Sequence, residues 1–310
     1  MTTHNAVDDA PVHSEPAQPE LVPIDSLTGE HVGRWTFLIL DGAAFMMQAM
    51  HPVIAEVTGR YSAAFNGDPA GRAVRSVDSV LRWTYGGAEA IAEGNRVRAL
   101  HQPITMHSER TGKQISALHT DAYQWVIATA YIVNAQSGPL LIGREFTDTE
   151  KQELLRDNIR LARLLHVPMR GYPQTHAEFT DYFEAKVLKL EGTPQARQLI
   201  DEMCTGNVDL PTVPAPLRPL VRTVLRPALR FNYLSVVGLL DPRLRAKLGV
   251  SWSASEQRQL VRIYTVIRTA YRILPDRLTY FPLAYHARKH HQCIEKMKVR
   301  QEKSYAYRLR

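Results

Sequence analysis

Apolar residues recur at intervals of three and four from Trp35 nearly to the end of the chain, and this spacing constrains the fold most. Such spacing places side chains on one face of an α-helix, and the alternation typical of strands is scarce. Three such faces comprise Val74, Val77 and Leu81; Leu154, Leu155, Ile159, Ala162 and Leu165; and Leu260, Ile263, Ile267, Ala270 and Leu274. Apolar residues make up 45% of the 310 positions, enough for a sizeable core. We therefore expect an all-α protein with a single multi-helix globular domain.

Two long apolar runs have alternative interpretations. The run from Trp35 to Met50 is interrupted by Asp41 and Gly42. It is shorter than the roughly 20 apolar residues of a membrane span, so we expect a buried core helix. The run from 126 to 133 could be a strand in isolation. It belongs to a longer segment, 121–135, which exceeds ordinary strand length and therefore predicts a second buried helix.

Several local signals predict where helices begin and end. Pro103 disfavours helical backbone at the preceding residue, so one helix should end near His101. The sequence Ser-Gly-Pro at 137–139 should end another. Capping boxes at 147–150 and 253–256 should each open a helix. The proline-rich segment 205–219 is expected to be a surface connection within one domain.

The two ends of the chain differ in charge. Residues 1–22 are polar and predict a disordered leader, 23–290 form the expected domain, and 291–310 form a basic tail. Residues 286–310 hold eight Lys and Arg against two acids, which favours either a solvated helix end or weak contact with a membrane surface. No basic stripe is interleaved with aromatic residues, so we expect no nucleic-acid partner. The first residues lack a secretory signal, and two distant cysteines fit a reducing compartment, so we expect a cytoplasmic protein.

Three segments carry residues suited to cofactor chemistry. They are HPVIAEV at 51–57, DPAGRAVRS at 68–76 and RVRALH at 96–101. A neutral histidine such as His101, facing an apolar cleft, is what haem iron needs as an axial ligand. Guanidinium groups such as that of Arg72 bind carboxylates bidentately, as haem propionates require. Taken singly, the histidine is more often a helix cap and the arginine a surface residue.

The order of these segments changes that balance, because the chain resembles the rubber-oxygenase/MpaB oxygenase family, which includes the latex-clearing proteins. The resemblance continues through Trp125-Val126, GLLDPRLRAKLGVSWS at 238–253 and ILPDRLTYFPLAYHA at 273–287, and so covers roughly residues 30–290. It implies an all-helical fold of the rubber-oxygenase type.

The resemblance also implies the residues of a site. His101 falls on the proximal ligand of a b-type haem and would therefore hold the iron. Arg72 and Ser76 fall on the family's Arg-x3-Thr pair in the haem pocket. Arg75 falls where latex-clearing proteins have a distal lysine, and Glu56 corresponds to the general base.

The chain departs from the family pattern at two further points. Serine replaces threonine at position 76, which keeps the hydroxyl. Ile127 stands where many bacterial relatives have histidine. Because of Ile127, loss or alteration of the activity is one reading of the sequence.

The leading hypothesis is a haem b-dependent oxygenase that uses O2 on an apolar or lipid-like small molecule. A haem-binding sensor or carrier without turnover is the second hypothesis, and a cofactor-free helical scaffold is the third. His107 and His119 are the alternative iron ligands. His286 and His290 have metal-ligand spacing, with His291 adjacent, but they lie in a basic segment poor in carboxylates. The sequence leaves the oligomeric state open.

Overall fold

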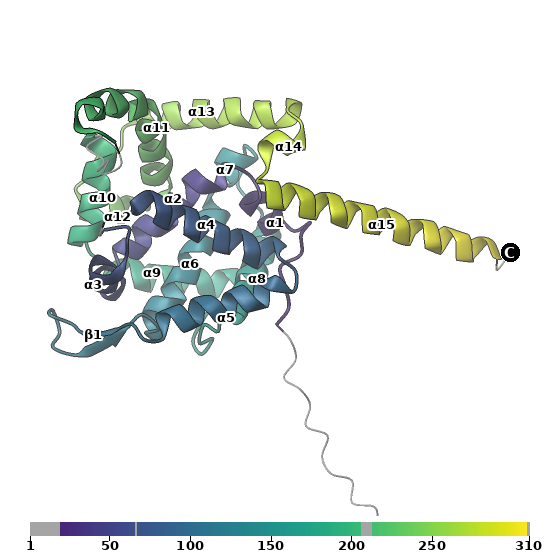
Figure 1. Cartoon of the computed structure of the whole chain (residues 1–310), viewed down its shortest axis with the longest axis horizontal. Coiled ribbons are helices and arrows are strands. Elements are labelled where there is room, and N and C mark those ends of the chain that lie inside the picture. The colour runs from purple at the N-terminus through teal and green to yellow at the C-terminus, as the bar shows by residue number, and fades with distance from the viewer. Residues whose placement is uncertain (1–18, 66, 206–212, 309–310) are drawn as a thin grey trace, which may run out of the picture.

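The computed structural model describes residues 19–65, 67–205 and 213–308, and α-helices make up most of these ranges (Figure 1). The predicted all-α class is therefore confirmed. The first helices are α1 (Leu27–Val32), α2 (Phe37–Ala49), α3 (Pro52–Tyr61), α4 (Pro69–Tyr85), α5 (Glu89–His101), α6 (Thr120–Gln136), α7 (Gly138–Leu141) and α8 (Asp148–Leu164). The remaining helices are α9 (His176–Lys189), α10 (Pro194–Thr205), the 3-10 turn η1 (Ala215–Leu217), α11 (Arg218–Leu239), α12 (Pro242–Leu248), α13 (Ala254–Ile273), α14 (Asp276–Thr279) and α15 (Pro282–Arg308).

Helix α2 lies at the centre of the main core, between α6 and α11. Its apolar residues pack against both neighbours, and the indole nitrogen of Trp125 on α6 donates to the carbonyl of Met47, 3.0 Å away. The sequence-based expectation of a buried core helix over this run is confirmed. In the described residues no single helix has both the length and the apolar composition of a membrane span; α2 and α3 pass jointly but bend by 106°.

A polar cluster holds the bend between α2 and α3. His51 Nε2 lies 3.0 Å from the carboxylate of Asp121 on α6, and Lys186 of α9 donates to the same carboxylate. The hydrogen bond from His51 and the charge of Lys186 both lower the pKa of Asp121, against the opposing effect of burial. His51, at the bend itself, is therefore held by charged groups on α6 and α9.

The local signals in the sequence mostly determine helix ends as expected. Both capping boxes are formed, at Thr147 with Glu150 and at Ser253 with Glu256. Helix α5 ends at His101 ahead of Pro103, and α6 runs through the apolar run at 126–133. The only strands in the described residues are β1 (Thr105–His107) and β2 (Gln114–Ser116), a short antiparallel hairpin that periodicity did not indicate.

The segments near the ends and the proline-rich connection are described in part. Residues 1–18 and 206–212 lie outside the described ranges, so the predictions for a disordered leader and for the centre of the connection fall largely on them. Within the predicted leader, Val22 is buried and Glu20 pairs with Arg160 at 3.0 Å. Helix α15 continues without a break through position 291 and projects from the body (Figure 1).

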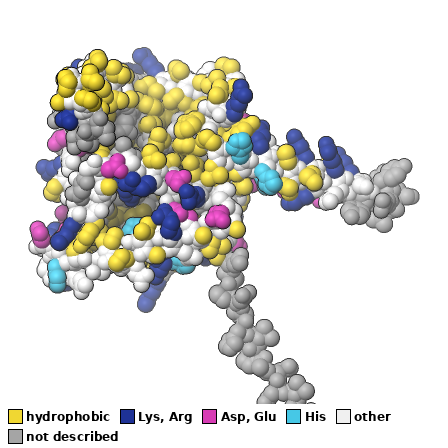
Figure 2. Space-filling view, in the orientation of Figure 1, with side chains coloured by type: hydrophobic (Ala, Val, Ile, Leu, Met, Phe, Trp, Pro, Cys, Tyr) yellow, Lys and Arg dark blue, Asp and Glu magenta, His cyan; other side chains and the backbone are white. Residues whose placement is uncertain are grey.

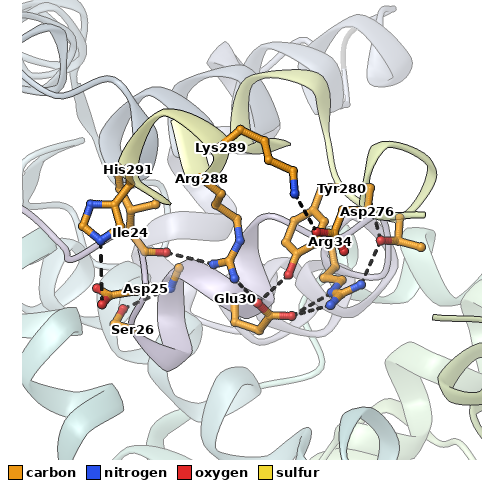
Figure 3. Close-up of polar contacts among 12 residues, drawn as sticks. Ile24, Asp25, Ser26, Glu30, Arg34, Asp276, Tyr280, Arg288, Lys289 and His291 are labelled. Atoms are coloured by element: carbon orange, nitrogen blue, oxygen red, sulfur yellow. Dashed lines mark hydrogen bonds and ion pairs between the residues drawn. The ribbon is translucent and has the colours of Figure 1, made fainter. Parts of the chain in front are cut away.

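The base of α15 is fixed to α1 by a network around Glu30 (Figure 3). The Glu30 carboxylate accepts hydrogen bonds from Arg34, at 2.9 Å, and from the hydroxyl of Tyr280. It also pairs with Arg288 of α15 at 2.7 Å, and Arg288 donates to the carbonyl of Ile24. The network joins residues about 250 positions apart, and it holds the projecting helix at a defined angle.

We predict that Glu30→Gln lowers the free energy of unfolding at neutral pH by about 2 kcal/mol, the scale of charged hydrogen bonds. Burial raises the pKa of Glu30, but the hydrogen bonds from Tyr280 and Arg34 and the charges of Arg34 and Arg288 outweigh it, so the net pKa is lowered. A lowered pKa gives stability above the unfolded value of 4.5 that is lost as pH falls.

Denaturant unfolding at neutral and acidic pH measures this effect, and the difference between wild type and variant should shrink in acid. Glu153→Gln is the matched control, because Glu153 forms only an exposed 3.8 Å pair with Arg156. If both variants lose the same free energy of unfolding, the network around Glu30 contributes no more than an exposed ion pair.

Candidate functional site

Helices α4 and α5 form an antiparallel hairpin that closes at Gly86 and Gly87 (Figure 1). Gly87 has a φ of 57°, in the left-handed region that a residue without a Cβ adopts readily. Arg72 and His101 stand at nearly equal numbers of residues from this turn. Because both helices rise about 1.5 Å per residue, the two residues lie at the same end of the hairpin.

His101 occupies the last position of α5 and is half-buried. Its Nδ1 lies 2.7 Å from the carbonyl oxygen of Val97, which can only accept, so Nδ1 carries the proton. Nε2 has no hydrogen-bond partner among the described residues. A histidine oriented by a backbone carbonyl through one ring nitrogen, with the other nitrogen free, has the arrangement of a metal ligand.

The two alternative histidines have less cover. His107 is exposed on β1, and His119 is exposed at the start of α6 without a side-chain cap bond. Among the described residues, no three or more His, Cys, Asp or Glu side chains group as metal ligands, and this includes His286, His290 and His291 on α15.

Arg72 and Ser76 lie one turn apart on α4. The Ser76 hydroxyl donates to the Arg72 carbonyl at 2.9 Å, which leaves its oxygen able to accept. Arg72 is half-buried, and its guanidinium makes no hydrogen bond to any described residue. Burial lowers the pKa of Arg72, Arg75 lowers it further, and Asp41 opposes both. The guanidinium is thus a partly desolvated cation, and a carboxylate would satisfy it.

Arg75 and Glu56 make other contacts. Arg75 is exposed and pairs with Asp68, the N-cap of α4, at 3.1 Å. Glu56 on α3 accepts from the hydroxyl of Ser108 at 2.8 Å and from the backbone of Glu109 at 2.6 Å. Both carboxylate oxygens of Glu56 therefore hold the loop of the β1–β2 hairpin.

Asp41 is the residue that sequence reasoning passed over. It lies on α2 among apolar neighbours and is partly buried, and its carboxylate makes no hydrogen bond to a described residue. Burial raises the pKa of Asp41 to about 6, and the charge of Arg72 acts in the opposite direction. The sequence signal was present, since Asp41 is the one charged residue in the run from Trp35 to Met50. A lone acid in an apolar helix is costly unless it has a role.

Asp41 faces a narrow cavity of about 60 Å³ between α1, α2, α4, α6 and α8. Its walls are mostly apolar and include Ile127. Two further polar atoms on its lining residues, Thr28 Oγ1 and Trp83 Nε1, are buried without a hydrogen-bond partner. Buried polar atoms of native proteins are normally paired, so these two atoms, beside the carboxylate of Asp41, favour a site that takes a ligand.

A larger hollow of about 450 Å³ lies between α10 and α11. Its described lining includes Cys204, Arg226, Arg230 and Tyr233 but no carboxylate or histidine. The described residues of this hollow therefore offer neither a carboxylate for proton transfer nor an imidazole for iron.

Comparison with known proteins gives one family match and two relatives. Residues 29–269 match the profile described as the catalytic domain of ER-bound oxygenase mpaB/B' and rubber oxygenase. Two uncharacterized mycobacterial proteins, Rv2237 of Mycobacterium tuberculosis and Mb2261 of Mycobacterium bovis, are each 27% identical over 157 residues, which is 51% of this chain. The matched region spans 57% of each relative's length. No solved structure matches the chain.

We predict that Asp41→Asn raises the free energy of unfolding at neutral pH by about 1–3 kcal/mol, since one pKa unit corresponds to about 1.4 kcal/mol. The folded pKa of Asp41 lies above its ordinary value of 3.8, so stability is full below 3.8 and is lost as pH rises through about 6. Denaturant unfolding at acidic and neutral pH measures the difference, which should vanish in acid. An Asp41→Asn protein that is less stable than wild type at neutral pH would contradict this account of Asp41.

Proposed function

The chain belongs to the family of the ER-bound oxygenase mpaB/B' and rubber oxygenase catalytic domain, and from this premise we propose that it is a haem b-dependent oxygenase acting on an apolar or lipid-like small molecule. The family supports an oxygenase-type activity in general. The haem, the substrate class and the roles of individual residues are our proposals.

The observation that carries the haem proposal is the free Nε2 of His101. The other ring nitrogen of His101, Nδ1, is bonded to the carbonyl of Val97. The guanidinium of Arg72, which makes no hydrogen bond to a described residue, lies at the same end of the hairpin. One neutral imidazole and one partly buried guanidinium fit the donor set of a b-type haem, with His101 on the iron, Arg72 on a propionate and Ser76 beside it. When bound, haem would supply the O2 chemistry.

The size of the cavity sets a condition on haem binding. A cavity of about 60 Å³ holds a few water-sized molecules and is too small for a porphyrin. Helix α4 packs chiefly on α5, α1 and α15 rather than on the core helices α2 and α6. We propose that the hairpin moves outward to admit the macrocycle, while the cavity beside Asp41 takes O2 or the reacting part of the substrate.

Asp41 is our candidate for the group that moves a proton. With a pKa near 6 it is largely ionised at neutral pH, and it faces a mostly apolar cavity. Glu56, which the family resemblance implies as the general base, has both oxygens engaged by the β1–β2 loop. Ile127 stands where many bacterial relatives have histidine, so the described lining of the cavity contains no imidazole. This also favours proton transfer through Asp41.

The alternatives predict different observations. A haem carrier would take up haemin and bind O2 without consuming it on any lipid. A cofactor-free scaffold, which the small cavity and Ile127 favour, would take up no haemin.

We predict that His101→Ala abolishes haem retention, because no other described residue offers a covered imidazole at the hairpin. Arg72→Ala should weaken binding by about 1.5–3 kcal/mol, the scale of a charge-assisted hydrogen bond. Titration with haemin, followed by the Soret band, measures both effects. His107→Ala and His119→Ala are matched controls and should bind normally. An unchanged Soret band in His101→Ala would transfer the ligand role to one of these two.

We predict that O2 consumption with an apolar alkene and a reductant rises as pH increases through about 6, where Asp41 ionises. Asp41→Asn should lower kcat about a hundredfold and remove this pH dependence, because general bases contribute at least that factor. The comparison variant is Glu56→Gln. If Glu56→Gln flattens the pH profile and Asp41→Asn leaves it intact, the family's expected base is the working one.

A further inference from the structure

Exposed apolar side chains gather over α11 and α13 on one face of the molecule (Figure 2). We use "apolar face" for Leu220 and Val224 of α11, Val266 and Ile273 of α13, and Leu278 of α14, which are 56–77% exposed. Large side chains this accessible are unremarkable singly, but a contiguous group of them marks an interaction site.

The same part of the chain carries most of the positive charge. Residues 213–310 hold 20 Lys and Arg against five Asp and Glu, whereas residues 1–212 hold 18 against 26. Several of these cations alternate with the apolar residues along α13, among them Arg262 and Arg272, and neither has an acidic partner within the described ranges. Their long aliphatic stems let the guanidinium groups reach past an apolar surface to anionic groups.

Helix α15 extends this pattern away from the body. Ile294 and Met297 are exposed on it, with Lys296 and Arg300 nearby and also exposed. The network around Glu30 fixes the base of this helix against the body (Figure 3). Exposed cations beside exposed apolar side chains suit the anionic headgroups and upper acyl chains of a bilayer.

We propose that the apolar face and α15 together dock the protein onto an anionic lipid membrane. A second copy of the chain is a less suitable partner for this surface, because a two-fold dimer would bring the same cationic groups against one another. A nucleic acid would leave Val224, Val266 and Ile273 without apolar cover. Anionic headgroups above acyl chains satisfy both the cations and the apolar side chains.

The test is flotation of the full chain with vesicles of phosphatidylcholine alone or of phosphatidylcholine mixed with phosphatidylserine. We expect binding to the mixed vesicles only, weakened by salt. Lys296→Gln and Arg300→Gln should each lower the partition coefficient about fivefold, since a cation near such a surface contributes about 1 kcal/mol. The experiment needs no haem, so its outcome is separate from that of the proposed oxygenase.

Ile273→Ser tests the apolar face, and Leu188→Ser on α9 is its control, because the two side chains are 77% and 76% exposed. Binding should fall several-fold in Ile273→Ser and stay unchanged in Leu188→Ser, with circular dichroism the same in both. The proposal is overturned if neither vesicle is bound, if both vesicles bind equally, if Ile273→Ser binds as wild type does, or if light scattering finds a stable dimer that Ile273→Ser dissociates.

Discussion

The burial of α2 is the constraint on which the rest of the structure depends. A helix this apolar must be covered over much of its surface, and α6 and α11 supply most of that cover. Partial burial makes a charged residue on α2 expensive, because the ion loses water without gaining a hydrogen-bond partner. Asp41 is placed there nonetheless, and among the described residues it is the charge of Arg72 that opposes the effect of burial on its pKa. The stability of the fold and the proposed role of Asp41 therefore make opposing demands at this residue.

The sequence predicted what depends on neighbouring residues. Helical periodicity, two capping boxes and the stop at Pro103 are local, since each arises from side chains within four positions of the backbone they affect. The α4–α5 hairpin was also predictable, because a glycine pair between two helical patterns requires a tight turn. It brings Arg72, Ser76 and His101 to one end, although their roles in the site are still predictions.

The sequence did not predict what depends on distant partners. The lone acid at Asp41 was visible, but its lack of a hydrogen bond emerges only when α1, α4, α6 and α8 surround it. Glu56 looked available as a base until folding brought Ser108 of the β1–β2 hairpin against it. The contact between Glu30 and Tyr280 spans 250 positions, a separation at which no local pattern carries information.

Helix α1 connects the cavity to the base of α15. Thr28 and Val32 of α1 line the cavity, while Glu30 of the same helix and Arg34 just beyond its end contact α14 and α15. A helix of six residues is a short, stiff rod, so it does not absorb a displacement by bending. A torque applied along the length of α15 therefore reaches the cavity wall by two routes, through α1 and through α4, which also contacts α15 and lines the cavity.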